Sequence, residues 1–174
     1  MEKRAVELAS TINRGVTIQV IHGHFATKHS HVSHCIDMTK IKSEMNMART
    51  TAKLFAEQFR YTPVDTIISL ERMKMVGAFL ASDLAATGIN VDRNIAVISP
   101  EITNDLLLLR DNFLPYVKGQ HVLLLTASAT TGQTIMSALE GIRYYGGEAV
   151  GAATVFGGDF KAVDVPVARL FNVD

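Results

Sequence analysis

Hydrophobic residues along the chain follow two alternating patterns, which predict strands and helices in turn. In one pattern, apolar residues recur at helical spacing, most clearly over residues 39–59, 76–88 and 135–142. Short apolar runs of the kind found in parallel strands buried on both faces occur at residues 64–70, 94–99, 122–125 and 149–156. The alternation predicts an α/β fold with an open, mostly parallel twisted sheet flanked by helices, which is Rossmann-like in its layers.

The two ends of the chain carry weaker patterns. Residues 2–14 place Ala5, Leu8, Ala9 and Ile12 on one face of a helix, and a strand is expected over residues 16–21. A last short strand is expected over residues 165–171. The stretch 101–110 is ambiguous, because its run of four leucines is compatible with a strand, a helix or a loop with an apolar anchor.

Composition favours one globular domain over residues 1–174. The chain is 48% hydrophobic and 20% charged, with a formal net charge of zero. A neutral surface argues against recruitment of nucleic acid or of an anionic membrane, and no apolar run is long enough to span a bilayer. The single cysteine, Cys35, excludes an internal disulfide. We expect a cytoplasmic protein that associates with itself.

Five of the six histidines lie between His22 and His34. Histidines two apart on a strand share a face, so His22 and His24, or His29 and His31, suggest a metal site. However, the spacing matches no familiar combination of histidine with cysteine or glutamate. We favour a polar, partly extended segment near a ligand or an interface, and we predict no metal ligands.

The stretch from His121 to Met136 has the features of a phosphate-binding turn. An apolar strand is followed by small and polar residues from Thr126 to Thr134, and then by a helical pattern. Backbone N–H groups at a helix start, together with the helix dipole, bind anions, and small residues let the anion approach. The turn has neither the lysine of a Walker loop nor the three glycines of a dinucleotide fingerprint. Thr130 and Thr131 are also compatible with a simple helix cap.

The same stretch resembles the phosphoribosyl diphosphate motif of type I phosphoribosyltransferases. That motif has four apolar residues, two acids, two apolar residues and then Thr-Thr-Gly-x-Thr or Ser. The resemblance implies that the ribose 5-phosphate is held by Ala129, Thr130, Thr131, Gly132, Gln133 and Thr134. It implies a small-molecule partner, either a phosphoribosyl compound or a nucleotide, and a homodimer.

A second segment resembles the N-terminal hood of orotate phosphoribosyltransferases. Phe25, Lys28, Ser33 and Asp37 match the hood in register. The resemblance implies a hood over about residues 15–38 together with residues 157–174. It also implies that Phe25 and Lys28 lie near an orotate-like base, and that the protein acts in pyrimidine nucleotide metabolism.

The chain departs from the family pattern where the chemistry is demanding. Thr126 and Ala127 replace the two acids, which grip the ribose hydroxyls partly through Mg²⁺, so Mg²⁺ is implied only by the family. The diphosphate-loop candidates are Glu71, Arg72 and Lys74, of which the two cations are equally compatible with solvated surface charges. Two functions follow: a divergent transferase for an orotate-like base, or a non-catalytic sensor of a nucleotide or phosphoribosyl compound.

Overall fold

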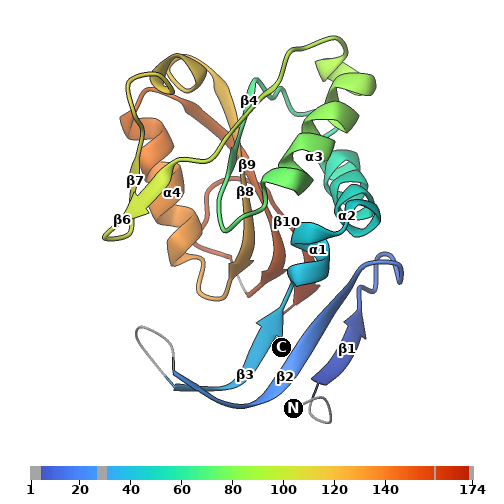
Figure 1. Cartoon of the computed structure of the whole chain (residues 1–174). Helices are drawn as coiled ribbons and strands as arrows, with labels where there is room; N and C mark the ends of the chain where they lie inside the picture. The colour runs from blue at the N-terminus through green and yellow to red at the C-terminus, as the bar shows by residue number, and fades with distance from the viewer. Residues whose placement is uncertain (1–4, 27–30, 159, 173–174) are drawn as a thin grey trace.

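The computed structural model, which describes residues 5–26, 31–158 and 160–172, contains a five-stranded parallel sheet (Figure 1). The strand order is β10-β9-β8-β4-β5, and every pairing between neighbours is parallel. The strands are β4 (Thr66–Ser69), β5 (Ala96–Ile98), β8 (His121–Ala129), β9 (Glu148–Gly157) and β10 (Val167–Asn172). The predicted α/β fold with an open parallel sheet is confirmed.

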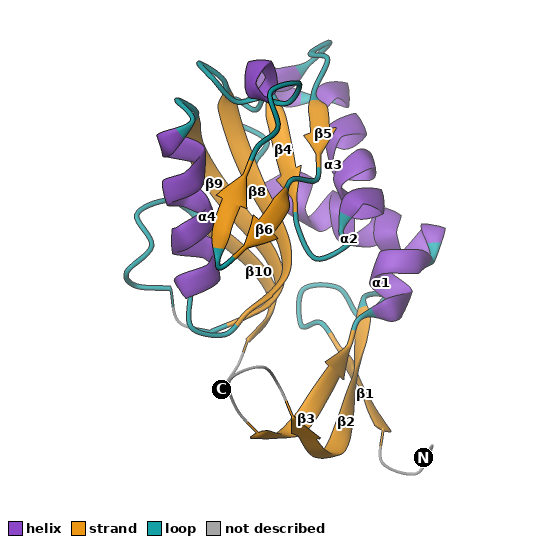
Figure 2. Cartoon of the chain, turned by 60° about the vertical axis from the view of Figure 1, so that its left-hand side comes forward, coloured by secondary structure: helices purple, strands orange, loops and turns teal. Residues whose placement is uncertain are grey.

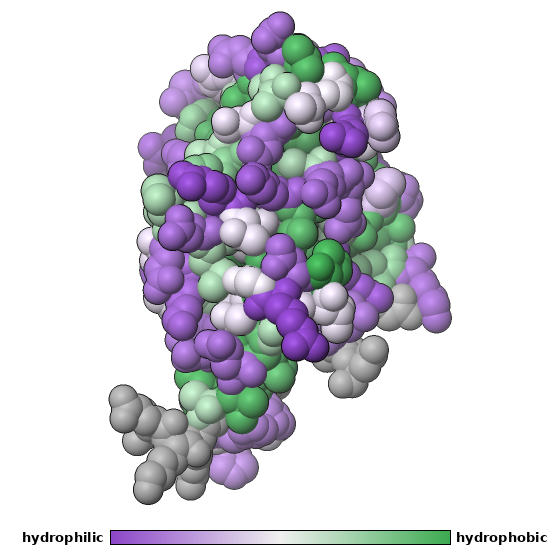
Figure 3. All heavy atoms as spheres, turned by 90° about the vertical axis from the view of Figure 1, so that its right-hand side faces the viewer, coloured by the Kyte–Doolittle hydropathy of each residue, from purple (hydrophilic) through white to green (hydrophobic). Residues whose placement is uncertain are grey.

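Helices cover both faces of this sheet (Figure 2). One face carries α1 (Thr39–Ser43), α2 (Met45–Gln58) and α3 (Lys74–Ala86), and the other carries α4 (Gln133–Tyr144). The helix predicted over residues 39–59 is divided at Glu44, whose backbone is extended. Two short 3₁₀ turns, Gly88–Asn90 and Leu114–Tyr116, lie in the connections. The surface on the side of α2 and α3 is mainly hydrophilic, with scattered apolar residues (Figure 3).

The central strand β8 separates two hydrophobic cores. Its successive side chains point to opposite faces, so Leu123 and Leu125 pack with α2 and α3, whereas Val122 and Leu124 pack with α4. All four are fully buried. This burial on both faces explains why the strand reads as a continuous apolar run in the sequence.

A separate antiparallel sheet forms the hood, which lies on the side of the carboxyl ends of β8, β9 and β10 (Figure 1). Its strands are β1 (Ala5–Ala9), β2 (Thr17–Ala26) and β3 (His31–Asp37). The helix predicted over residues 2–14 is therefore wrong within its described part. Ala5 to Ala9 pair along their whole length with β2, and these backbone hydrogen bonds override the helical spacing of the side chains.

The end of the chain joins the large sheet. Residues 157–174 were expected in the hood because of the family resemblance, but β10 pairs in parallel with β9 from Val167 to Asn172. The hood contacts this segment through shared core residues such as Ile18 and Leu170, and through a hydrogen bond in which the buried Ser10 hydroxyl donates to the Leu170 carbonyl oxygen at 3.0 Å. The C-terminal segment thus supports the hood from the sheet, and that part of the hood assignment is corrected.

The ambiguous stretch after residue 100 is a small hairpin. β6 (Glu101–Thr103) pairs with the antiparallel strand β7 (Leu106–Leu108), and the turn residues Asn104 and Asp105 have positive φ angles of 51° and 61°. Two consecutive residues of positive φ are the signature of a tight type I′ hairpin turn. Leu107 anchors the hairpin in the core beside α4.

Within the described ranges, the helices are all too short or too polar to cross a membrane.

Candidate functional site

The candidate site lies where the neighbouring strands β4 and β8 end. Ser69 on β4 pairs with Leu125 on β8, and the Leu70 N–H donates to the Leu125 carbonyl oxygen at 2.8 Å. β4 ends at this level, whereas β8 continues for four more residues to Ala129, so the loop after β4 lies beside the last part of β8. Ligands of open parallel sheets bind at this carboxyl edge, and the hood lies on the same side (Figure 1).

The loop after β8 forms an anion cradle at the start of α4. Gly132 is the N-cap residue, with a left-handed φ of 74°, and helix α4 starts at Gln133. The Gln133 N–H lies 3.4 Å from the Thr131 hydroxyl oxygen, while the side chains of Thr130, Thr131 and Thr134 are exposed. The first backbone amides of this twelve-residue helix have no partner within the helix, which makes its start a place where an anion can bind.

The predicted turn is shorter than the sequence suggested. Thr126 to Ala129 continue β8, paired with β9, so that the loop itself spans only residues 130–132. Ala129 is buried at the end of the strand and supports the loop from below. Thr126 and Ala127, at the positions of the family's acid pair, are both fully buried in the strand.

Packing and backbone conformation both favour glycine at position 132. A Cβ atom at Gly132 would lie 3.1 Å from Cδ1 of Phe160, so a side chain would press on this ring. The positive φ would add strain for any residue with a Cβ. The turn and its packing against Phe160 thus each require a glycine at this position, and the role of Gly132 in holding a phosphate stays a prediction.

Gly157 and Gly158, at the end of β9, lie beneath the cradle. The Gly158 N–H donates to the Ala129 carbonyl oxygen at 3.1 Å, and a Cβ at Gly158 would overlap the carbonyl oxygen of Thr130. Arg169 donates to the Gly158 carbonyl and lies 5.9 Å from the Phe160 ring centre. The sequence placed these residues in the hood and gave them no part in the cradle, although two successive glycines at the end of an apolar strand are a signal for close backbone approach.

The loop after β4 places a carboxylate on the end of β8. The Thr126 hydroxyl donates to Glu71 Oε1 at 2.8 Å, and the Ser128 hydroxyl donates to Glu71 Oε2 at 3.2 Å. Glu71 and Arg72 both have left-handed backbones, with φ angles of 53° and 61°. The structure therefore brings Glu71 to the position of the absent acids, although sequence reasoning assigned it to diphosphate binding.

The two cations of the same segment are exposed to solvent. Arg72 follows Glu71, and Lys74 is the first residue of α3; both are exposed. The buried side chain of Met73 anchors the loop between them. Their assignment as diphosphate contacts stays a prediction.

The hood candidates are only partly described. Phe25 is half-buried on β2 and pairs with Val32 on β3, whereas Lys28 lies outside the described residues. His22 and His34 pair across the two strands, and their rings meet edge to face at 4.4 Å. Across residues 5–26, 31–158 and 160–172, three or more His, Cys, Asp or Glu residues do not gather in a way that would hold a metal ion.

A cavity of about 460 Å³ separates the hood from the edge of the large sheet. Leu8, Ile12 and Ile18 line it from the hood side, and Phe156 and Leu170 line it from β9 and β10. The walls are mainly apolar, with Arg169 contributing a charge. Sequence reasoning missed this cavity because it depends on the strand at the N-terminus, which was predicted as a helix.

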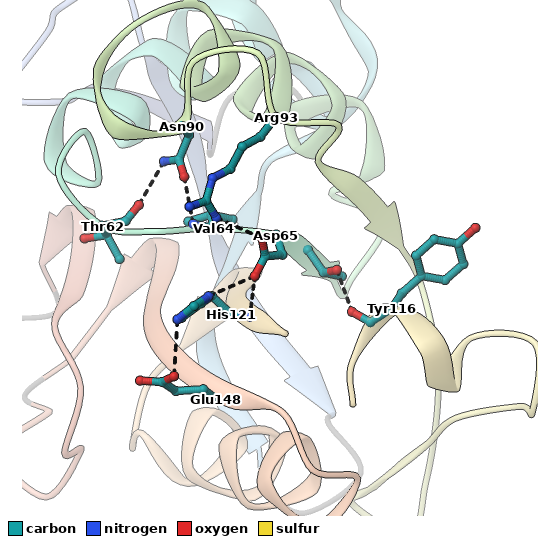
Figure 4. A network of polar contacts seen from close by, with 9 residues as sticks. Thr62, Val64, Asp65, Asn90, Arg93, Tyr116, His121 and Glu148 are labelled. Carbon is teal, nitrogen blue, oxygen red and sulfur yellow. Dashed lines mark hydrogen bonds and ion pairs between the residues drawn. The ribbon is translucent and has the colours of Figure 1, made fainter. Parts of the chain in front are cut away.

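A network of hydrogen bonds and ion pairs around Asp65 connects the strands at the opposite end of the sheet (Figure 4). One Asp65 carboxylate oxygen accepts the backbone N–H of His121 at 2.8 Å and lies 2.9 Å from the ring Nδ1 of His121. The other accepts from Arg93 at 2.8 Å, and Glu148 lies 3.3 Å from the second ring nitrogen. Burial alone would raise the pKa of Asp65, but these hydrogen bonds and the Arg93 charge outweigh it and lower the pKa below its ordinary value.

The residues at the acid-pair positions do not fit Mg²⁺. This cation prefers carboxylate oxygens, but Thr126 offers one hydroxyl that already donates to Glu71, and Ala127 offers no donor atom. Ala127 also faces the core shared with α2 and α3. Glu71 is the carboxylate that lies beside these positions, and each of its two oxygens already accepts a hydrogen bond from a hydroxyl group.

Comparison with known proteins gives structural neighbours only. No protein-family model and no curated protein sequence matches the chain. Leishmania donovani UMP synthase is similar at a TM-score of 0.64 and 18% identity; the match covers 88% of this chain and 33% of that one, so the chain spans about a third of its length.

Two further structures cover more of both chains. Adenine phosphoribosyltransferase from Trypanosoma brucei, in complex with AMP, pyrophosphate and ribose 5-phosphate, has a TM-score of 0.62 and 14% identity over 86% of this chain and 75% of that one. Mycobacterium tuberculosis orotate phosphoribosyltransferase, in complex with inorganic phosphate, has a TM-score of 0.58 and 20% identity over 88% of each chain. The chain therefore has the fold of the type I phosphoribosyltransferases.

Proposed function

We propose that this protein binds a ribose 5-phosphate compound through the loop from Ala129 to Thr134. The supporting observation is the cradle itself, in which Gly132 caps α4 and exposed threonines flank the first amides of the helix. This cradle lies at the carboxyl edge of a parallel sheet, on the side that carries the hood. Neighbours of the same fold carry inorganic phosphate, AMP or ribose 5-phosphate in their structures.

We favour binding over phosphoribosyl transfer. Transfer develops positive charge on the ribose, and preorganised negative groups at that place lower the barrier. Thr126 and Ala127 supply no negative charge. Glu71 supplies one carboxylate, whose oxygens already accept two hydrogen bonds from hydroxyl groups. Binding in this site is expected to be independent of Mg²⁺. The protein would then act as a sensor or carrier of a nucleotide or phosphoribosyl compound, in the cytoplasm and as a homodimer.

Transfer to an orotate-like base is the second candidate function, and the carboxylate of Glu71 is the observation that favours it. It predicts release of diphosphate from phosphoribosyl diphosphate in the presence of a base, with Phe25 and Lys28 of the hood near that base. We expect no release above background with orotate, uracil or the purine bases. If the wild type releases diphosphate and the variant Thr131→Asp, which places a negative charge in the cradle, does not, the protein is a transferase instead.

The cradle is tested by a charge placed at Thr131. Its side chain is exposed, and both Thr131→Asp and Thr131→Asn retain an oxygen that can accept the Gln133 N–H. The two variants therefore keep the turn and differ in one charge. We expect ribose 5-phosphate to raise the melting temperature of the wild type and of Thr131→Asn, and to have no effect on Thr131→Asp.

The unliganded melting temperatures of the two variants provide the control for folding. Equal stabilisation of Thr131→Asp and Thr131→Asn by ribose 5-phosphate would place the ligand elsewhere. Absence of stabilisation by ribose 5-phosphate, AMP, orotidine 5′-phosphate and inorganic phosphate, all at millimolar concentration, would reject the proposed function.

A further inference from the structure

Two histidines of the hood face each other across neighbouring strands. His22 on β2 pairs in register with His34 on β3, and the centres of their rings are 4.4 Å apart. Directly opposite residues of an antiparallel pair have their Cβ atoms close enough for the side chains to meet. Spacing along one strand, as between His22 and His24, does not reveal this arrangement, which depends on the register of the hairpin.

The pair lies on the face of the hood that turns toward the large sheet. Side chains two apart on a strand point to the same side, so His22 shares a face with Ile18 and Val20. Ile18 is buried in the same core as Leu170 of β10. Ile36, the partner of Val20, packs against that core. The two histidines come next along this face, and both are exposed, so their rings are accessible where the face leaves the core.

The separation of the two rings suits a single metal ion. Imidazole nitrogens bind Zn²⁺ at about 2.0–2.1 Å. Two imidazoles at a right angle around one ion therefore hold their ring centres roughly 4.5 Å apart, and at a tetrahedral angle roughly 5.2 Å apart. The observed 4.4 Å is close to the first value. Because both side chains are exposed, each can rotate to aim one nitrogen at an ion between the strands.

Ser33 orients one of the two rings. Its hydroxyl oxygen lies 2.7 Å from Nδ1 of His34. In the tautomer in which Nδ1–H donates to this oxygen, the free lone pair of the ring is on Nε2. Histidines that bind metals commonly donate their other ring N–H to an outer partner, which fixes both the tautomer and the ring. Ser33 is in the position of such a partner.

The number and type of ligands define the kind of ion. Among the residues that the structure describes, no third His, Cys, Asp or Glu gathers with this pair, so water would complete the coordination. Two imidazoles with water suit Cu²⁺, Ni²⁺ and Zn²⁺, of which Cu²⁺ binds most tightly. Mg²⁺ and Ca²⁺ prefer oxygen ligands and do not suit the pair.

We propose that His22 and His34 form a two-histidine site for a divalent transition metal, Cu²⁺, Ni²⁺ or Zn²⁺, on the face of the hood that turns toward the large sheet. The bound ion links β2 to β3 and stabilises the hairpin. This inference is independent of the proposed function, because it requires no phosphate in the cradle.

The test is a titration of the full chain, without a histidine tag, with Cu²⁺ at neutral pH, followed by electron paramagnetic resonance. The variants His22→Gln and His34→Gln each remove one ligand and keep a polar side chain. His31→Gln is the matched control, because His31 is exposed on β3 and pairs with Ala26 instead. We expect the wild type and the control to bind one Cu²⁺ tightly, with coupling to two nitrogens.

In His22→Gln and in His34→Gln we expect the two-nitrogen coupling to disappear. Affinity for Cu²⁺ should fall by more than the roughly tenfold that the loss of an outer partner costs. Zn²⁺ should raise the melting temperature of the wild type and of His31→Gln but not of the two variants, whereas Mg²⁺ should change none of them. The melting temperatures without metal control for folding.

The spectrum of the wild type can overturn the inference without any variant, if Cu²⁺ does not bind or couples to fewer than two nitrogens. A two-nitrogen signal that persists in His22→Gln or His34→Gln would also overturn it. An equal loss of affinity in His31→Gln would place the metal elsewhere among the histidines and would reject this site.

Discussion

Asp65 links three strands at the end of the sheet opposite the candidate site, and its charge contributes to stability. The side chain is 28% exposed and accepts from His121 and Arg93. Asp65→Asn keeps the shape and removes the charge, so we expect a loss of about 1–2 kcal/mol in the free energy of unfolding at neutral pH. Urea denaturation at several pH values measures it.

The pH dependence of this effect has a definite sign. Because the pKa of Asp65 is lowered in the folded protein, its contribution is present above the ordinary value of 3.8 and is lost as the pH falls through the lower folded value. The difference between wild type and Asp65→Asn should therefore shrink in strong acid. Asp164→Asn, in an exposed pair with Arg143, is the control and should change stability less. A difference that grows in acid would contradict the account.

Single residues of the site were predictable to different degrees. The pattern around Thr130 to Thr134 predicted the turn between β8 and α4, because strand, small turn and helix are all local in sequence. The role of Glu71 was not predictable in the same way. Its carboxylate reaches Thr126, 55 residues away, through the pairing of β4 with β8 and a left-handed turn without glycine. The hydrophobic pattern specifies neither this pairing of strands nor the conformation of the turn.

At the scale of elements, glycine sets how closely β9 approaches α2. A Cβ at Gly151 would lie 2.6 Å from Cε1 of Phe59, a buried side chain at the end of α2, and 3.3 Å from Leu123. We expect Gly151→Ala to destabilise the protein by about 1–3 kcal/mol, because the added methyl group overfills the core. Thermal unfolding followed by circular dichroism gives the size of the change.

Gly119→Ala is the control for Gly151→Ala, because at position 119 an alanine causes backbone strain without crowding the core. Gly119 has a φ of 72°, and a Cβ there would meet no atom within 4 Å. Its cost should be that of a left-handed alanine alone, roughly 1 kcal/mol. The packing between β9 and α2 would be looser than described if Gly151→Ala cost less than Gly119→Ala.

Burial on both faces explains why three of the strands of the large sheet were predicted correctly. The strands over residues 64–70, 122–125 and 149–156 carry nearly continuous apolar runs because helices cover both of their faces. β1 has an exposed side chain at every position, so burial left no pattern in its sequence. Its partner β2 defines it, and pairing between distant segments is invisible to a local reading.

For the whole molecule, the alternation of strands and helices was sufficient to predict the layers but not the order of the strands. The last strand pairs beside β9, although the resemblance to a hood had drawn it to the other sheet. That pairing brings Arg169 and Gly158 beneath the cradle, and it closes the cavity between hood and sheet. The end of the chain therefore supports the candidate site, which the sequence pattern did not reveal.

The most direct test of the central claim is a titration of the ¹⁵N-labelled protein with ribose 5-phosphate, followed by amide chemical shifts. We expect saturable shifts that are largest at Gly132, Gln133 and Thr134, unchanged by removal of Mg²⁺ and absent in Thr131→Asp. Shifts centred on the cavity around Leu170, on the cluster around Asp65, or nowhere in the spectrum would contradict the assignment of the cradle.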